Sequence, residues 1–238
     1  MQDREAEALK REAAVRAAGW IQDGMVLGLG TGSTVRYLLE EIGARIALGE
    51  WTRCVGVPTS EHTARRAREL GIPLTTLAQH PRVDLTIDGA DEVNPGLELI
   101  KGLGGALLRE KIVATASERV IIVVDESKRV TRLGTRSPLP VEVDPFGAPI
   151  QVPFLEGLGA EVTLRRTASG DPVVTDGGNY LFDCHFPGGI PDPAALGTVL
   201  DGRPGIAENG LFLGFVDHVV VASAGGVDVL SRAREAAS

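Results

Sequence analysis

Short apolar runs alternate with helix-like segments over the first half of the chain, and this alternation limits the possible folds more than any other feature. Runs typical of buried strands occur at residues 25–29, 54–57, 83–87 and 119–124. Segments typical of helices occur at residues 4–18, 35–48, 61–70 and 104–118. Apolar strands that are separated by helices indicate a parallel sheet with helices on both faces. We therefore expect an α/β, Rossmann-like fold with a mostly parallel sheet.

The chain changes character after about residue 133, where prolines and glycines become frequent. Residues 175–179 are typical of a hairpin turn, and residues 180–186 then alternate as an amphipathic strand. Residues 192–200 suggest a helix, and a buried-strand pattern returns at residues 216–222. We therefore expect a smaller inserted α+β (ferredoxin-like) domain of residues 133–205, between the two parts of a Rossmann-like domain, residues 1–132 and 206–238.

Charge and composition argue against several classes of partner. The chain has 24 basic and 32 acidic residues, a net charge of −8, and no basic patch, so nucleic acid and anionic membrane surfaces are poor partners. No apolar run reaches the roughly 18 residues of a membrane span. Cys54 and Cys184 match no metal-binding or redox spacing, which fits a reduced, cytoplasmic setting with both thiols buried. The four scattered histidines form no ligand pattern, so we expect no metal site.

Lysine is scarce, and its few positions are therefore candidates for chemistry. The chain has 4 lysines among its 24 basic residues, so 20 are arginine; the lysines are Lys10, Lys101, Lys111 and Lys128. Lysine is a compact point charge, whereas arginine is a broad planar fork. Composition bias alone could leave four lysines. Their places beside glycine-rich segments and after a buried strand favour a role in binding an anion.

The segment GLGTGST (28–34) lies between a predicted strand and a predicted helix, which is the layout of a phosphate-binding loop. Backbone N–H groups at a helix N-terminus favour an anion, and the hydroxyls of Thr31, Ser33 and Thr34 add donors. A dinucleotide fingerprint fits less well, because Ser33 replaces its third glycine and the next strand ends without the acidic residue that holds a ribose. A purely structural turn is the remaining alternative.

Two further segments carry candidate groups. Asp88 and Asp91 follow an apolar strand at its expected C-terminal end, where sites of open α/β sheets usually lie; helix capping or a solvated loop is the alternative. In KGLGGALLREK (101–111), glycines allow close backbone approach. Glu110 falls among apolar positions of the predicted helix, where a carboxylate binds protons more tightly and suits a general base. Pairing of Glu110 with a nearby Arg or Lys is the alternative.

Together these segments resemble the A-type ribose-5-phosphate isomerase family. The resemblance covers most of the chain and rests on the order and spacing of eight segments: GLGTGST (28–34), GVPTS (56–60), IDGADEV (87–93), KGLGGALLREK (101–111), DESK (125–128), PVEV (140–143), TDGGNY (175–180) and ENGLF (208–212). It implies interconversion of ribose 5-phosphate and ribulose 5-phosphate through an enediolate, without a metal or other cofactor, by a homodimer or homotetramer.

The resemblance also implies roles for single residues. Glu110 would be the proton-transfer base, and Lys101 with the backbone of Gly102, Leu103 and Gly104 would contact the reacting oxygens. The acidic turn would hold sugar hydroxyls, and Asp88 would also assist ring opening; this turn comprises Asp88, Gly89, Ala90 and Asp91. The phosphate would be bound by Thr31, Gly32, Ser33, Thr34, Lys128 and Lys10. No substrate role falls on Lys111.

Two departures from the family pattern and two rival functions need a structural answer. Leu103 stands where the family usually has a third consecutive glycine, and Pro149 and Pro153 fall within an expected helix. Glu208 begins an ENG stretch that resembles CoA-transferases, in which the glutamate is a nucleophile. A sugar-phosphate sensor is the non-enzymatic alternative, although the residues before the glycine loop leave no room for its usual DNA-binding motif.

Overall fold

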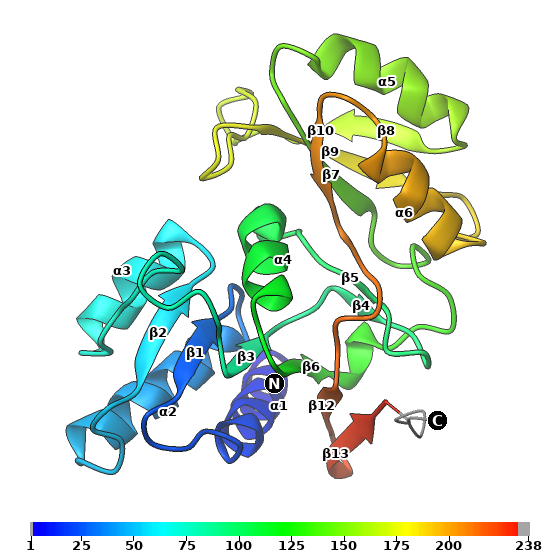
Figure 1. Cartoon of the computed structure of the whole chain (residues 1–238). Coiled ribbons are helices and arrows are strands. Elements are labelled where there is room, and N and C mark those ends of the chain that lie inside the picture. Colours follow the sequence, from blue (N-terminus) through cyan, green and yellow to red (C-terminus); the bar gives the residue numbers. More distant parts are fainter. Residues whose placement is uncertain (1, 233–238) are drawn as a thin grey trace, which may run out of the picture. The chain divides into compact units, whose positions relative to one another are not determined.

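The computed structural model describes residues 2–232, with side chains from residue 7 onward, and divides into two compact units (Figure 1). The first unit comprises Met1–Gly89, Ile112–Lys128 and Gly214–Ser238, and the second comprises Ala90–Lys111 and Arg129–Leu213. Residues 90–111, 129–132 and 206–213 thus belong to the second unit, although the sequence suggested a place in the first domain. The reason is a small sheet in which β5 (Leu99–Ile100) pairs with β4 (Glu92–Val93) and β11 (Leu211–Phe212).

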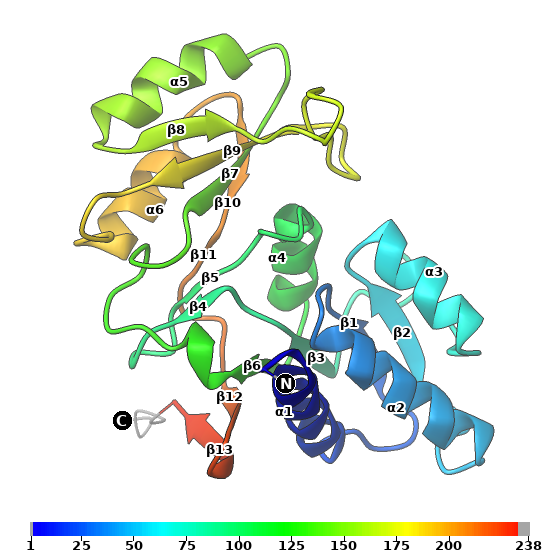
Figure 2. The ribbon, with the colours of Figure 1, turned by 180° about the vertical axis from the view of Figure 1, so that it is seen from behind.

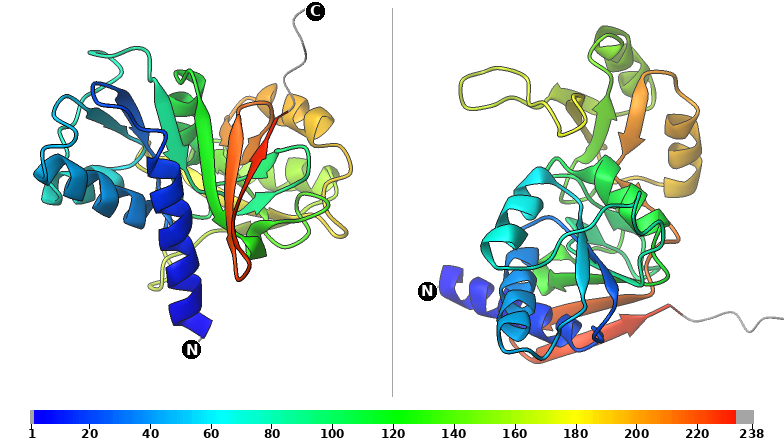
Figure 3. Two further views of the ribbon diagram at one scale, coloured as in Figure 1. Left: turned by 90° about the horizontal axis from the view of Figure 1, so that it is seen from below. Right: turned by 60° about the vertical axis from the view of Figure 1, so that its left-hand side comes forward.

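The first unit is built on a six-stranded sheet in the order β13-β12-β6-β3-β1-β2. Its strands are β1 (Val26–Leu29), β2 (Val55–Pro58), β3 (Leu85–Asp88), β6 (Val120–Asp125), β12 (His218–Ser223) and β13 (Gly226–Ser231). All neighbours pair in parallel except β12 and β13, which form the antiparallel hairpin that Figure 3 shows beside β6 in orange and red. The predicted α/β class with a mostly parallel sheet is confirmed.

The pleat of these strands sends alternate side chains to two cores. Leu27 and Leu29 of β1 pack into a large cluster with α1 (Gln2–Ala18) and α2 (Val35–Ala47), which lie together on one face (Figure 2). On the other face, Val113 of α4 (Leu107–Thr115) packs with Val57 and Val83. The helix α3 (Glu61–Glu69) is capped at its N-terminus by Ser60, whose hydroxyl accepts the N–H of Thr63. Helices therefore cover both faces, as the sequence predicts.

The second unit contains a four-stranded antiparallel sheet in the order β10-β7-β9-β8. Its elements follow one another as β7 (Leu139–Val143), α5 (Ala148–Gly157), β8 (Glu161–Leu164), β9 (Tyr180–His185), α6 (Pro193–Asp201) and β10 (Ile206–Asn209). This β-α-β-β-α-β order is that of the ferredoxin-like arrangement. The helix α5 forms despite its prolines, since Pro149 lies in the first turn, where no N–H is needed, and only Pro153 lies inside.

Both cysteines are free and buried, as the sequence predicts. Cys184 on β9 packs in the core of the second unit, and burial raises the pKa of its thiol to about 12. Burial also raises the pKa of Cys54 in the first unit. No helix within residues 2–232 is both long and apolar enough to cross a membrane.

Candidate active site

In the first unit, the candidate groups collect at one edge of the sheet. Because β1, β3 and β6 are parallel neighbours, their C-terminal ends meet at the same edge. The glycine-rich segment 28–34, called here the first glycine loop, follows β1; Asp88 ends β3; and Lys128 ends the short 3-10 helix Glu126–Lys128 after β6. The structure therefore places these groups at the C-terminal edge of the sheet, as expected.

Gly30 and Asp88 touch so closely that only glycine fits. A Cβ atom on Gly30 would lie 2.2 Å from Asp88 Oδ1 and 2.6 Å from Asp88 Cα. The buried Asp88 carboxylate accepts the backbone N–H groups of Thr31 at 3.0 Å and Gly89 at 2.7 Å. Asp88 thus bonds the backbone of two loops, and it neither caps a helix nor lies in solvent. Its contact with a sugar hydroxyl stays a prediction.

A cluster of hydroxyl groups supports the first glycine loop. Thr31 Oγ1 lies 2.8 Å from Thr59 Oγ1, 2.9 Å from Ser60 Oγ and 3.1 Å from Thr63 Oγ1. Thr59 and Thr63 in turn donate to the loop's own carbonyls, at Leu29 and Gly30. The Thr31 hydroxyl is therefore occupied by this cluster. The exposed Gly32 and Ser33 form the tip of the loop.

The sequence patterns identified Thr59 and Ser60 only as part of the segment GVPTS (56–60). They did not predict that these residues support the first glycine loop. The available signal was that small hydroxyl residues follow β2 at the same sheet edge as the first glycine loop.

The lysines of the first unit differ in their surroundings. Lys10 on α1 is partly buried, and its Nζ lies 3.3 Å from Glu7 Oε1. Lys128 is partly exposed at the sheet edge described above. Lys128 therefore lies beside the strand ends. Lys10 is already paired with Glu7, and a bound anion would have to compete with that carboxylate.

In the second unit, Asp91 and the segment 101–105, called here the second glycine loop, are joined directly. Asp91 Oδ2 accepts the backbone N–H of Leu103 at 2.9 Å. Gly102 and Gly105 have positive φ values of 109° and 77°, which explains why both are glycines. The only non-glycine residue with positive φ in the described chain is Leu97, so Leu103 occupies a backbone position that any residue tolerates. Its side chain is 42% exposed.

Lys101 and Glu110 form a buried pair. Lys101 Nζ lies 3.3 Å from Glu110 Oε1, and the two side chains are 3% and 5% exposed. The Lys101 backbone N–H donates to the Gly210 carbonyl at 2.9 Å, and its ammonium lies 5.4 Å from the Phe212 ring centre. The predicted burial of Glu110 is confirmed, and so is the alternative that it pairs with a cation. Its partner, Lys101, is itself a candidate site residue, so the pairing keeps Glu110 within the candidate site.

The structure gives Lys111 a structural role. Its ammonium lies 2.6 Å from Glu208 Oε1 and donates to the Asn209 carbonyl at 2.8 Å. The next residue, Gly210, approaches Lys101 so closely that a Cβ would lie 2.4 Å from the Lys101 carbonyl oxygen. The ENG segment therefore supports Lys101, and Glu208 is held in an ion pair that does not suit a nucleophile.

The carboxylate that directly follows the acidic turn, that of Glu92 on β4, also has a structural role. The fully buried Glu92 accepts the N–H groups of Gly134, Arg136 and Ser137, each at 2.6 Å. Glu92 thus ties the acidic turn to the segment before β7.

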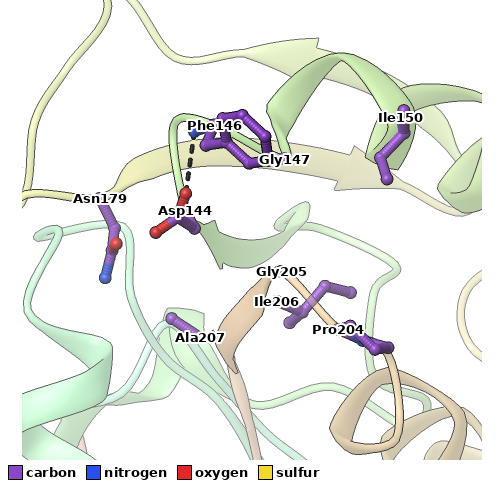
Figure 4. Close-up of a pocket in the computed structure, with 9 residues that line it drawn as sticks. All are labelled: Asp144, Phe146, Gly147, Ile150, Asn179, Pro204, Gly205, Ile206 and Ala207. Atoms are coloured by element: carbon purple, nitrogen blue, oxygen red, sulfur yellow. Dashed lines mark hydrogen bonds between the residues drawn. The ribbon is translucent and has the colours of Figure 1, made fainter.

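A pocket of about 580 Å³ lies elsewhere in the second unit, beside β10 and the start of α5 (Figure 4). Its lining is mostly apolar or glycine, and its polar side chains are Asp144 and Asn179. Asp144 Oδ1 accepts the N–H of Phe146 at 2.8 Å. None of the predicted site residues lines this pocket, so its size does not mark it as the place of the chemistry. In the part of the chain with described side chains, no three His, Cys, Asp or Glu groups converge as metal ligands.

Comparisons with known proteins agree with these features. The family model "Ribose 5-phosphate isomerase A (phosphoriboisomerase A)" matches residues 55–226. The chain is 55% identical to the ribose-5-phosphate isomerase A of Roseiflexus castenholzii over 218 residues, 92% of this chain and 93% of the relative. It is 56% identical to that of Gloeobacter violaceus over 226 residues, 94% and 96% of the two chains.

Solved structures are similar over the same extent. A D-ribose-5-phosphate isomerase in complex with phospho-erythronic acid has a TM-score of 0.93 and 41% identity, with 95% of this chain and 99% of that chain covered. The enzyme of Methanocaldococcus jannaschii has a TM-score of 0.90 and 40% identity, with coverage of 94% and 99%.

Proposed function

Because the chain belongs to the ribose 5-phosphate isomerase A family, and is an isomerase that interconverts ribose 5-phosphate and ribulose 5-phosphate, we propose that Glu110 is its base and Lys101 its oxyanion partner. The observation that carries this assignment is the buried pair of Lys101 Nζ and Glu110 Oε1, 3.3 Å apart. An opposite charge at this distance stabilises the ionised carboxylate, which is the form that accepts a proton.

The proposed reaction moves one proton between adjacent carbons of the open-chain sugar. Glu110 removes the proton from C2, and the electron pair moves to the carbonyl oxygen on C1 to give an enediolate. The Lys101 ammonium and the backbone N–H of Gly104 in the second glycine loop stabilise this negative charge. Glu110 then returns the proton to C1, while the hydroxyl proton on O2 passes to O1. The step uses only side chains and backbone.

The first unit supplies the proposed phosphate anchor. The backbone of Thr31, Gly32, Ser33 and Thr34 leads into the N-terminus of α2, where N–H groups and the helix dipole favour an anion. Lys128 and Lys10 add positive charge in an acidic chain. The buried carboxylate of Asp88 and that of Asp91 are proposed to hold sugar hydroxyls beside the neighbouring Gly89 and Ala90, and Asp88 to assist ring opening. Binding energy at the phosphate positions the reacting carbons.

We also propose a homodimer or homotetramer and a cytoplasmic location. Phe146 and Ile150 expose apolar side chains on the second unit, at 99% and 60%, which favours a contact with another copy. Free, buried cysteines fit a reducing compartment. Sedimentation of the wild-type chain, compared with Phe146→Asp, tests the first proposal. A wild-type chain that sediments as a monomer contradicts the proposed oligomer. A sedimentation coefficient that Phe146→Asp leaves unchanged contradicts a contact at Phe146.

Glu110→Gln tests the base. We expect its turnover to fall by about 10²–10⁴-fold, the usual contribution of a general base, in a direct assay of ribulose 5-phosphate formation without added metal or nucleotide. Inorganic phosphate should bind as in the wild type, because the anchor is untouched. Glu118→Gln, which changes an exposed carboxylate in the first unit, is the control. Near-normal turnover in Glu110→Gln would rule out Glu110 as the base.

A further inference from the structure

Arg165, which follows β8, bonds directly to the second glycine loop, a contact that no sequence motif signalled. Its Nη1 donates to the carbonyl oxygens of Gly102 at 3.1 Å and Leu103 at 3.0 Å. Its Nε and Nη2 donate to the two carboxylate oxygens of Asp183 on β9, a bidentate pair. The two side chains are 16% and 22% exposed. Asp183 therefore fixes the guanidinium, and the guanidinium holds two consecutive carbonyls of the loop.

Holding these carbonyls also sets the direction of the N–H groups that follow them. A peptide unit is planar and trans, so its N–H points away from its C=O. With the Gly102 carbonyl turned to Arg165, the Leu103 N–H points the other way, where Asp91 Oδ2 accepts it at 2.9 Å. With the Leu103 carbonyl held in the same way, the Gly104 N–H is also directed away from Arg165. Successive N–H groups on one side of a loop favour negative charge, and here the Leu103 N–H already binds the Asp91 carboxylate while the Gly104 N–H lies next to it in the chain.

We propose that Arg165 is a positioning residue for the isomerisation. Through the carbonyls of Gly102 and Leu103 it presents the Gly104 N–H to the oxyanion that Lys101 also stabilises. Its positive charge on the carbonyl side polarises both peptide groups and makes their N–H ends stronger donors. This inference rests on the proposed roles of Lys101 and Glu110, and it adds a residue that lies 62 positions further along the chain from Leu103.

The geometry requires arginine rather than lysine. Two edges of the guanidinium are used at once, one by the Asp183 carboxylate and one by the two carbonyls. A lysine ammonium has three donors at a single point and cannot keep both sets of bonds in the same directions. The Arg165→Lys variant therefore keeps the charge and the approximate size while it removes the alignment.

The test compares Arg165→Lys and Arg165→Ala with Arg166→Ala, whose guanidinium donates to the Gly170 carbonyl in an exposed turn. One oxyanion donor is worth about 10²–10³-fold. Misalignment of the donor should therefore lower the kcat of Arg165→Lys by about 10- to 100-fold. Its KM and its affinity for inorganic phosphate should stay within about twofold, because binding of the ground state is unchanged. Affinity for phospho-erythronic acid, whose carboxylate resembles the enediolate, should fall with kcat, and Arg166→Ala should resemble the wild type.

Chemical rescue separates positioning from simple support of the fold. Guanidinium ion at millimolar concentration should restore part of the kcat of Arg165→Ala, whereas ammonium ion should not. Unchanged kcat in Arg165→Lys overturns the inference, and so does a joint loss of kcat, phosphate affinity and melting temperature without rescue. Glu110→Gln is measured alongside: if it stays active, the proposed base is wrong, whereas an inactive Glu110→Gln beside a normal Arg165→Lys rejects only the role of Arg165.

Discussion

The chain contains two glycine-rich loops that lead into helices, and they are held in place by different kinds of group. The first glycine loop rests on uncharged hydroxyls, with Thr31 at the centre of a cluster of four. Charged groups surround the second glycine loop: Asp91 and Arg165 bond its backbone, and Lys101 at its start pairs with Glu110. One carboxylate, Asp88, contacts the first loop, and it accepts the backbone N–H of Thr31.

This difference matches the charge that each loop is proposed to meet. A phosphate carries its charge before, during and after the reaction, so neutral donors and a helix N-terminus bind substrate and transition state equally. The charge of an enediolate exists only briefly, and groups that stabilise it must already be aligned when it develops. Changes in the first glycine loop should therefore act mainly on KM, and changes in the second mainly on kcat.

The largest effect in this comparison is expected for Lys101. Lys101→Met should lower kcat by about 10²–10³-fold, the usual cost of one oxyanion donor, with little change in KM. Lys101→Arg should recover little of this loss, because the buried space beside Glu110 and Phe212 suits a compact ammonium rather than a planar fork. Steady-state kinetics with ribose 5-phosphate measures both variants.

Lys111→Met is the matched control for Lys101→Met, since its ammonium lies 5.0 Å from the same Phe212 ring. This control should lower the melting temperature through loss of the bond to Glu208, yet keep most of the turnover. If Lys111→Met loses kcat as strongly as Lys101→Met, the second loop does not depend on Lys101 in particular. Full activity in Lys101→Arg would likewise remove the argument that this position needs lysine.

A smaller effect, on KM, is expected for Thr31. Thr31→Val keeps the shape of the side chain and removes the hydroxyl that links Thr59, Ser60 and Thr63. A lost buried hydrogen bond costs about 1–3 kcal/mol, so KM should rise by about 10-fold while kcat changes little. Thr75→Val, which breaks the bond between the Thr75 hydroxyl and His80 Nδ1, is the control and should lower stability without changing KM. A fall in kcat without a change in KM would contradict the division of labour between the loops.

The sequence predicted the parallel sheet and its helices because each of these elements shows a local apolar pattern. The apolar runs of β1, β3 and β6 are long enough for burial to be read from them, and they place Asp88 and Lys128 at the ends of strands. The small sheet that draws residues 90–111 into the second unit could not be predicted in this way. Each of its strands has two residues, too few to show any period.

The supports of the candidate site were less predictable than its chemical groups. Glu110 and Lys101 stand in one segment, so an apolar helix and a rare lysine were enough to select them. Arg165 and Gly210 reach the same loop from distant strands, and only the register of β8, β9 and β10 brings them there. Nothing in the sequence around Arg165, one of 20 arginines, indicates that it contacts the second glycine loop.

The smallest effect is expected at the other end of β1, where Asp23 precedes the strand. Its carboxylate accepts the backbone N–H groups of Arg53 at 2.8 Å and Thr52 at 2.7 Å, and the bond from the Arg53 backbone is the main reason that its pKa is lowered to about 2. A carboxylate whose pKa is lower in the folded state stabilises the fold above its unfolded value, and this contribution is lost as pH falls toward the folded value. In urea unfolding, Asp23→Asn should therefore be less stable than wild type at neutral pH, and this difference in the free energy of unfolding should hold down to about pH 4 and narrow toward about pH 2.

Both kcat and KM should be unchanged, because neither glycine loop is touched. A stability gap that does not depend on pH would show that the Asp23 carboxylate is not held by these bonds, and a change in KM would show that the first glycine loop depends on more than its hydroxyls.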